Sequence, residues 1–520
     1  MSVRTRIPVT LITLLAAGLL VGGCGSSGPG GGVATGGSGW HGSGSPGGGS
    51  PGGGSVAVRA PAGYASAHPA RSDGGPDRPP AEADPARTPD STFAMDVDSA
   101  SYGYARRQLE QGLRPAPDTV RPEEFVNAFR QDYPQPSGDG FTLTQDGARL
   151  PPEHHGSPEG DIRLLRIGLQ TRDDGPDRPD AALTFVIDVS GSMGDPGKLD
   201  MVKRALQSFL DQVRPTDSVA IVTFDDQAHV VRAMTPVRER ADLRAAVDRL
   251  EAGGDTNLEA GLVQGYRVAR QGFRQGMTNR VVLLSDGLAN TGDTEAAPIL
   301  DRVRDEAAKQ ITLLGVGVGN DYGDRLMEQL ADHGDGFVVY VSDEGAARRT
   351  FVQTLPAARS VRALDAKVQV TFDPRTVAGY RLIGYDDRAL ASTDFRDDRV
   401  DGGEVAAGHS VTALYTVRLR DGARGQVAHT QLRWQDPHTR AAVETGAEVT
   451  VADLDRRLDQ AGARLQVCYA AAYLAERLRQ SRHGSEVSAT YLARIADAAA
   501  STTEDDAVRE LARMIRNVPG

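Results

Sequence analysis

The middle of the chain alternates short apolar runs with amphipathic helical patterns, and this alternation constrains the fold more than any other sequence feature. Each run has the length of one strand, and the segments between the runs have apolar residues at helical spacing. Strands that alternate with helices are typical of a parallel sheet covered by crossover helices. The runs are Leu183–Ile187, Ser218–Phe224, Arg280–Leu284 and Ile311–Val316. We therefore predict an α/β domain with a doubly wound, mostly parallel sheet over residues 164–357.

The segments on either side of this domain predict three smaller modules. Residues 91–160 combine a strand-like segment with two short helical patterns, which indicates a small N-terminal α/β module. Residues 361–451 contain mainly strand patterns and indicate a β-sandwich-like module. Residues 453–518 have apolar residues at helical spacing and indicate a helical C-terminal module.

The N-terminus has the pattern of an export signal. Basic residues precede the apolar stretch Ile7–Val21, which is short for a membrane-spanning helix. The stretch ends in Leu20-Val21-Gly22-Gly23-Cys24, which resembles the lipobox of bacterial lipoproteins. The resemblance implies a lipoprotein signal peptide over residues 1–23 and a lipid attached to Cys24. An ordinary signal peptide followed by an incidental cysteine remains the alternative.

Residues 24–90 are rich in Gly, Pro and Ser, and they predict a disordered tether. A flexible chain of this length has an r.m.s. reach of about 40–50 Å. We therefore expect an exported protein, lipid-anchored to the outer face of the bacterial cytoplasmic membrane or to the cell envelope. The formal net charge of -12 disfavours a nucleic-acid partner, because such proteins have a basic domain or stripe.

Polar side chains follow several of the predicted strands at the edge where open α/β sheets bind ligands. Asp188, Ser190 and Ser192 come directly after the strand Leu183–Ile187. Thr256 lies in a loop before a predicted helix, and Asp286 follows the strand Arg280–Leu284. Carboxylate and hydroxyl oxygens suit Mg²⁺, Mn²⁺ or Ca²⁺ rather than Zn²⁺ or Cu²⁺. The alternative is that these loops only cap helices and turns.

The pattern Asp188-x-Ser190-x-Ser192, with a distant threonine and a later aspartate, resembles the metal-ion-dependent adhesion site (MIDAS) of von Willebrand factor A (VWA) domains. The resemblance implies that Ser190, Ser192 and Thr256 coordinate a divalent cation, most simply Mg²⁺. Asp188 and Asp286 would act directly or through water. It also implies a coordination position left open for an Asp or Glu carboxylate of a protein partner.

Two flanking regions resemble the YfbK-like family of bacterial VWA proteins. The N-terminal resemblance lies in residues 92–102 and 121–127, and the C-terminal one in residues 380–385 and 408–415. The resemblance covers residues 91 to 518 and implies an architecture rather than a specific partner.

These observations leave two hypotheses for function. In the first, an envelope-anchored lipoprotein binds a protein partner through a metal-bridged carboxylate. In the second, the chain is an envelope scaffold or assembly factor whose metal site is structural or filled internally. An enzyme is not expected, because the segment Gly191–Gly194 is not a Gly-x-Ser-x-Gly elbow and no Walker-type loop is present. We interpret Cys468 as a small buried hydrophobe, and Asp225 and Asp226 as turn residues.

Overall fold

The computed structural model describes residues 82–518, except for short segments at 96–98, 152–153, 155–160, 174, 176–178, 288–295, 308, 320–324, 335, 342, 356–360, 387, 399, 401 and 438. The predicted signal peptide, Cys24 and residues 24–81 of the predicted tether lie outside the described residues. In the described part, every helix is too short or too polar to cross a bilayer.

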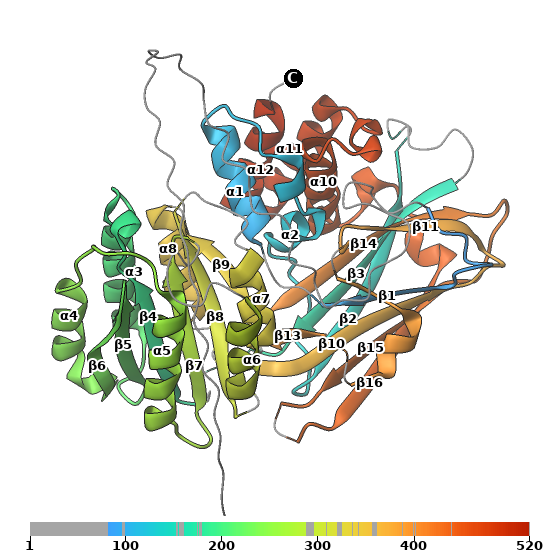
Figure 1. Cartoon of the computed structure of the whole chain (residues 1–520). Helices are drawn as coiled ribbons and strands as arrows, with labels where there is room; N and C mark the ends of the chain where they lie inside the picture. Colours follow the sequence, from blue (N-terminus) through green and yellow to red (C-terminus); the bar gives the residue numbers. More distant parts are fainter. Residues whose placement is uncertain are drawn as a thin grey trace, which may run out of the picture. The chain divides into compact units, whose positions relative to one another are not determined.

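The α/β unit, which we define as residues 181–355, contains one six-stranded sheet (Figure 1). The strand order is β6-β5-β4-β7-β8-β9, and all neighbours are parallel except β5 and β6. This arrangement confirms the predicted doubly wound, mostly parallel sheet. Its strands are β4 (Ala181–Asp188), β5 (Ser218–Phe224), β6 (Ala228–Pro236), β7 (Thr278–Ser285), β8 (Ile311–Val318) and β9 (Val338–Val341).

Helices cover both faces of this sheet, which explains why its central strands bury apolar side chains on both sides. In β4, Phe185 and Ile187 pack into one core, whereas Val186 packs into the other. One face carries α3 (Leu199–Gln212), α4 (Arg240–Asp248), α8 (Glu344–Arg349) and the π-helical turn η5 (Thr350–Thr354). The other face carries α5 (Leu258–Gly272), α6 (Ala296–Ala307) and α7 (Arg325–His333).

Two antiparallel sheets pack face to face as a sandwich around a shared apolar core. One sheet has the order β11-β14-β3-β2, and the other has the order β12-β1-β10-β15-β16, with β13 also paired to β10. The strands are β1 (Asp90–Ala94), β2 (Phe141–Arg149), β3 (Asp161–Thr171), β10 (Val361–Phe372), β11 (Val377–Ile383), β12 (Ala389–Leu390), β13 (Gly403–Ala406), β14 (Ser410–Leu419), β15 (Gln426–Gln435) and β16 (Ala442–Thr450).

The sandwich differs from the predicted modules in where its strands come from. β1 pairs with β10, and β2 and β3 join β14, so residues on both sides of the α/β unit build the same two sheets. β3 includes residues 164–171, which the sequence placed in the α/β domain. It belongs to the sandwich because Leu165, Ile167 and Leu169 alternate into the sandwich core. Order also begins before residue 91, because Ala83 bridges to Tyr380.

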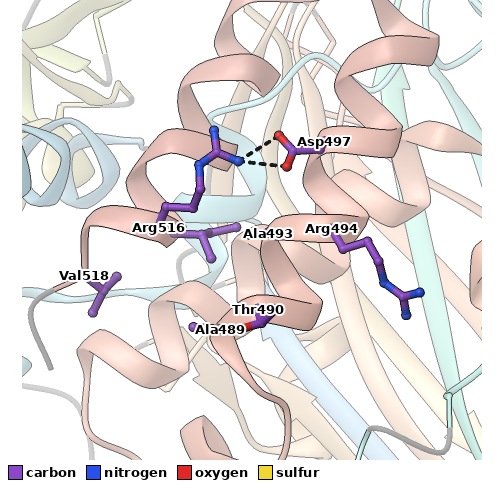
Figure 2. A pocket seen from close by; sticks show the side chains of 8 residues that line it. Ala489, Thr490, Ala493, Arg494, Asp497, Arg516 and Val518 are labelled. Atoms are coloured by element: carbon purple, nitrogen blue, oxygen red, sulfur yellow. Dashed lines mark hydrogen bonds and ion pairs between the residues drawn. The ribbon is translucent and has the colours of Figure 1, made fainter.

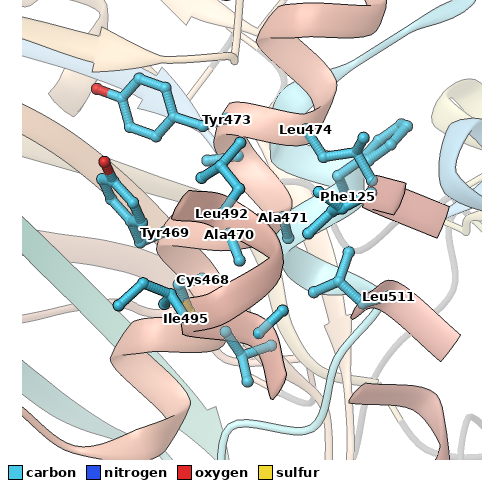
Figure 3. Packing of buried hydrophobic residues seen from close by; sticks show 14 of the residues in the cluster. Phe125, Cys468, Tyr469, Ala470, Ala471, Tyr473, Leu474, Leu492, Ile495 and Leu511 are labelled. Atoms are coloured by element: carbon cyan, nitrogen blue, oxygen red, sulfur yellow. The ribbon is translucent and has the colours of Figure 1, made fainter. Parts of the chain in front are cut away.

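The helices from the two ends of the described chain form one bundle. α1 (Ala100–Glu110) and α2 (Pro122–Asn127) share an apolar core with α10 (Ala463–Leu478), α11 (Ala489–Thr503) and α12 (Asp506–Asn517). Figure 3 shows Phe125 of α2 and Leu474 of α10 in this core, with Cys468 also inside it. Cys468 is fully buried, which confirms its interpretation as a core residue. The N-terminal helices therefore complete the C-terminal bundle rather than forming a separate module.

Glu486 connects this bundle to the loop after β2 and makes stability depend on pH. Its carboxylate pairs with His483 and lies 3.4 Å from Nε2 of the buried His154. Burial alone would raise the pKa of Glu486, but the hydrogen bonds from His154 and His483 outweigh it and lower the pKa to about 2. A carboxylate with a lowered pKa stabilises the fold above its unfolded-state pKa and loses that effect as pH falls toward the folded value.

We therefore expect Glu486→Gln to lower the free energy of unfolding at pH 6 by about 1–2 kcal/mol, after allowance for solvent screening. Urea denaturation should show the difference from the unsubstituted protein narrowing from about pH 4.5 toward pH 2. Glu448→Gln, on exposed β16, is the matched control and should show no such trend. A difference that stays constant over this range would contradict the assigned pairing.

Candidate metal centre

Asp188 is the last residue of β4 and is fully buried. Its Oδ1 accepts a hydrogen bond from the Ser190 backbone N–H at 2.9 Å, and its Oδ2 accepts one from the Ser285 hydroxyl at 2.6 Å. Burial raises the pKa of Asp188 above its ordinary value, although the hydrogen bonds from Ser190 and Ser285 act in the opposite direction. The carboxylate is therefore held in one orientation at the carboxyl end of the central strand.

The two serines of the loop after β4 connect to the second carboxylate. The Ser190 and Ser192 hydroxyl oxygens are 3.2 Å apart, and the Ser192 hydroxyl donates to Asp286 Oδ1 at 2.8 Å. Asp286 follows β7, the strand next to β4, and its side chain is only 2% exposed. The structure thus brings four of the five predicted residues, Asp188, Ser190, Ser192 and Asp286, to adjacent strand ends within one hydrogen-bond network.

The loop that carries Thr256 is attached directly to the loop after β4. The Gly191 backbone N–H donates to the Gly254 carbonyl at 2.9 Å, and the Gly253 N–H donates to the Val189 carbonyl at 2.7 Å. Gly254 has a φ of 78°, a left-handed conformation that favours glycine at this contact. Thr256 itself is buried, with 3% of its surface exposed. The fifth predicted residue therefore lies in a loop that is held against the other four.

Asp225 and Asp226, predicted as turn residues, hold this second loop in place. Asp226 Oδ1 accepts a hydrogen bond from the Asp255 backbone N–H at 2.9 Å. The Asp225 carbonyl accepts one from the Asn257 N–H at 2.8 Å, and Asn257 in turn caps α5. Their contacts position the loop on both sides of Thr256.

Lys198 is a charged residue of the site that the sequence analysis did not identify. Its ammonium nitrogen lies 2.7 Å from Asp286 Oδ2 and 3.4 Å from Asp195 Oδ2. Burial acts to lower the pKa of Lys198, but Asp286 and Asp195 outweigh it and raise that pKa. Its position in the sequence could have identified it, because Lys198 is the N-cap of α3. At an N-cap the helix dipole disfavours a cation, and Ser, Thr, Asn or Asp is preferred.

Ser285 is a second residue that the sequence analysis did not assign. It ends β7 directly before Asp286, and its buried hydroxyl donates to Asp188 Oδ2. Residues that orient a metal ligand typically contribute 10–100-fold to metal affinity, so we expect Ser285→Ala to weaken Mn²⁺ binding by about tenfold or more. Titration calorimetry measures the effect. Ser208→Ala is the control, because the Ser208 hydroxyl donates to the Arg204 carbonyl of its own helix, α3, and equal affinities for both variants would contradict the role of Ser285.

The donor chemistry of the site fits a hard divalent cation. Two carboxylates and three hydroxyls offer only oxygen atoms, which are the ligands that Mg²⁺, Mn²⁺ and Ca²⁺ prefer. Within the described ranges, no group of three or more His, Cys, Asp or Glu could hold a metal ion. Such a group is not required here, because hydroxyls supply three of the five predicted ligands. Metal ligation by these five residues stays a prediction.

A pocket of about 520 Å³ lies between α11 and α12 and is separate from this site (Figure 2). Asp497 and Arg516 form an ion pair within its lining at 2.8 Å, as Figure 2 shows. Its other lining residues are mainly small or aliphatic, and none of the five predicted ligands contributes to it. The pocket therefore offers no ligand set comparable to the loops at the sheet edge.

Comparisons with known proteins match three parts of the chain. Residues 182–354 match the von Willebrand factor type A domain, residues 360–519 match the C-terminal domain of uncharacterized protein YfbK, and residues 80–156 match a model described as von Willebrand factor. The chain is 33% identical over 344 residues to uncharacterized protein YfbK of Escherichia coli strain K12, covering 64% of this chain. It spans 59% of the length of that relative.

Two solved structures are similar to parts of the chain. A von Willebrand factor type A protein from Catenulispora acidiphila is 18% identical, covers 74% of this chain and 91% of its own, and has a TM-score of 0.43. Proximal thread matrix protein 1 from the mussel byssus, solved with a zinc-occupied MIDAS motif, is 17% identical. It covers 36% of this chain and 49% of its own, with a TM-score of 0.30.

Proposed function

This chain is a YfbK-like VWA protein, and from that premise we propose that it is an envelope-anchored lipoprotein that binds a protein partner through a metal ion. VWA domains mediate protein–protein interactions, so the α/β unit is the interacting part. The single observation that supports the proposal most strongly is the hydrogen-bond network that joins Asp188, Ser190, Ser192 and Asp286.

We assign Mg²⁺ as the cation, held by the hydroxyls of Ser190, Ser192 and Thr256. Asp188 and Asp286 complete the coordination of the cation, either directly or through water. Only two of these five groups are anionic and the other three are neutral hydroxyls, so the ligands do not exceed the charge of a divalent cation, and the cation stays electrophilic at its open coordination position. Such a centre attracts a carboxylate, so the partner presents an Asp or Glu side chain. The metal supplies Lewis acidity toward that carboxylate.

The anchor in this proposal is the lipid on Cys24, supported by the lipobox-like sequence and the preceding apolar stretch. A lipid on Cys24, followed by a tether that ends before Ala83, holds the interacting domain outside the cytoplasmic membrane. Metabolic labelling with radioactive palmitate tests this part. Label should enter the protein and be lost in Cys24→Ala, whereas Cys468→Ala should keep it.

The alternative function is an envelope scaffold in which the metal site is structural or filled by an acidic group of the same chain. In the described part of the chain, the side chain that contacts Asp286 Oδ2 is Lys198, a cation, whereas an internally filled site requires an acidic group of the same chain at the metal. The observation favours a centre that accepts a carboxylate from a partner.

Partner capture with the full-length protein distinguishes the two functions. The bait is incubated with solubilised envelope proteins in Mg²⁺ or in EDTA, and the Asp188→Ala variant is compared with Asp248→Ala from α4. We expect a partner that Mg²⁺ retains and that both EDTA and Asp188→Ala release, with Asp248→Ala behaving as unsubstituted protein. If EDTA and Asp188→Ala lower the melting temperature but leave capture unchanged, the scaffold function is correct.

A further inference from the structure

Lys198 is largely buried and contacts the candidate metal site through Asp286. Its side chain is 17% exposed, whereas the Asp286 side chain that it contacts is 2% exposed. The stem of Lys198 passes over Gly319, where an added Cβ would lie 3.2 Å from the lysine Cε. Gly319 is itself fixed, because its carbonyl accepts a hydrogen bond from Arg107 Nη1 of α1 at 2.7 Å.

Both carboxylate oxygens of Asp286 are already engaged. Oδ1 accepts from Ser192, and Oδ2 pairs with the Lys198 ammonium. Two cations next to one buried carboxylate repel each other strongly, because the low local dielectric increases Coulomb energies. A divalent cation that uses Asp286 therefore meets the lysine ammonium at the same group.

The type of residue fits this role. The chain has 58 Lys and Arg residues together, and only four of them are lysines. An ammonium is a compact point charge, similar in this respect to a metal ion, whereas a guanidinium is a planar fork that binds carboxylates through two parallel hydrogen bonds. Lys198 can therefore neutralise Asp286 without occupying the space of a bidentate pair.

We propose that Lys198 is a built-in competitor of the divalent cation, which must displace the ammonium from Asp286 in order to bind. This inference rests on the proposed function and adds a regulatory element to the same site. The pairing sets metal affinity below the value that the five oxygen ligands alone would give. It also keeps the Asp286 carboxylate neutralised when no metal is present in solution.

For the test, the full-length protein is first freed of metal with EDTA. Mn²⁺ is then titrated into it, and calorimetry measures the dissociation constant. Lys198→Met removes the ammonium and keeps the aliphatic stem. We expect its dissociation constant for Mn²⁺ to fall by about tenfold or more relative to the unsubstituted protein. Lys203→Met is the matched control, because Lys203 lies on the same helix and donates to the backbone carbonyls of Asp248 and Leu250. Its affinity should be unchanged.

The outcomes separate this inference from the proposed function. If the unsubstituted protein binds Mn²⁺ and Lys198→Met binds it equally or more weakly, the competitor role is overturned and the metal-binding function remains. Tighter binding by Lys198→Met supports the competitor role, including the case in which only this variant binds. If neither protein binds Mn²⁺, both proposals are wrong.

Protein stability provides a second readout. In EDTA, Lys198→Met should melt at a lower temperature than the unsubstituted protein, because Asp286 keeps a buried charge without its partner. Added Mn²⁺ should restore the melting temperature. If Lys198→Met does not fold in EDTA, Lys198→Gln keeps a neutral donor to Asp286 and must also bind Mn²⁺ more tightly. An unchanged affinity in Lys198→Gln would overturn the inference.

Discussion

Replacing Asp188 by asparagine should weaken Mn²⁺ binding by at least about 100-fold. Loss of a residue that only orients a ligand costs about 10–100-fold, and Asp188 is itself a predicted ligand and one of two anionic groups at the site. Asparagine keeps the shape of the side chain and can still accept the hydrogen bond from the Ser190 N–H. The loss should therefore reflect the missing charge, and titration calorimetry measures it.

Folding of this variant is checked separately. Burial disfavours the charged form of Asp188, so an uncharged amide at this position should leave the melting temperature in EDTA unchanged or higher. Asp248→Asn, on α4 of the same unit, is the control and should bind Mn²⁺ normally. If Asp188→Asn folds and still binds Mn²⁺ within tenfold of the unsubstituted protein, Asp188 is not a ligand.

Replacing Glu476 by alanine should lower the free energy of unfolding by about 3–5 kcal/mol, because it breaks a buried ion pair and leaves one charge alone. Glu476 of α10 lies 2.8 Å from Arg381 of β11, and the two side chains are 2% and 3% exposed. The pair connects the helical bundle to the sandwich. Chemical denaturation in urea measures the loss.

Two further variants test whether the loss of stability in Glu476→Ala comes from the buried charge. The double variant Arg381→Met/Glu476→Met removes both charges and should cost much less than Glu476→Ala alone, because replacing a buried pair by apolar groups is often close to neutral. Asp497→Ala breaks an exposed pair with Arg516 and should cost about 1 kcal/mol or less. A double variant as unstable as the single one would contradict this explanation.

The parallel sheet could be predicted because its signal is local. The central strands are mainly apolar, as Phe185, Val186 and Ile187 of β4 show, since helices bury both faces of the sheet. The antiparallel pairing of β1 with β10, or of β3 with β14, connects residues more than two hundred positions apart. No local pattern specifies such partners, so the sequence suggested separate modules where the structure has one sandwich and one helical bundle.

The candidate site was predictable for a related reason. Asp188 and Asp286 directly follow two strands, and Ser190 and Ser192 follow Asp188, so a parallel sheet brings them to one edge. Lys198 and Ser285 act through contacts that sequence spacing does not encode. The stem of Lys198 passes over Gly319, and its ammonium contacts Asp286. The Ser285 hydroxyl, at the end of β7, donates to Asp188 on the neighbouring strand β4.

Diffraction from crystals grown with Mn²⁺, measured at the manganese absorption edge, directly tests whether these five residues hold a metal ion. We expect one anomalous peak bounded by the hydroxyl oxygens of Ser190, Ser192 and Thr256, with the Lys198 ammonium moved away from Asp286. The same crystals of Asp188→Asn should lack the peak. Manganese bound to other residues, or no peak at this edge of the sheet, would show that these residues do not form the metal site.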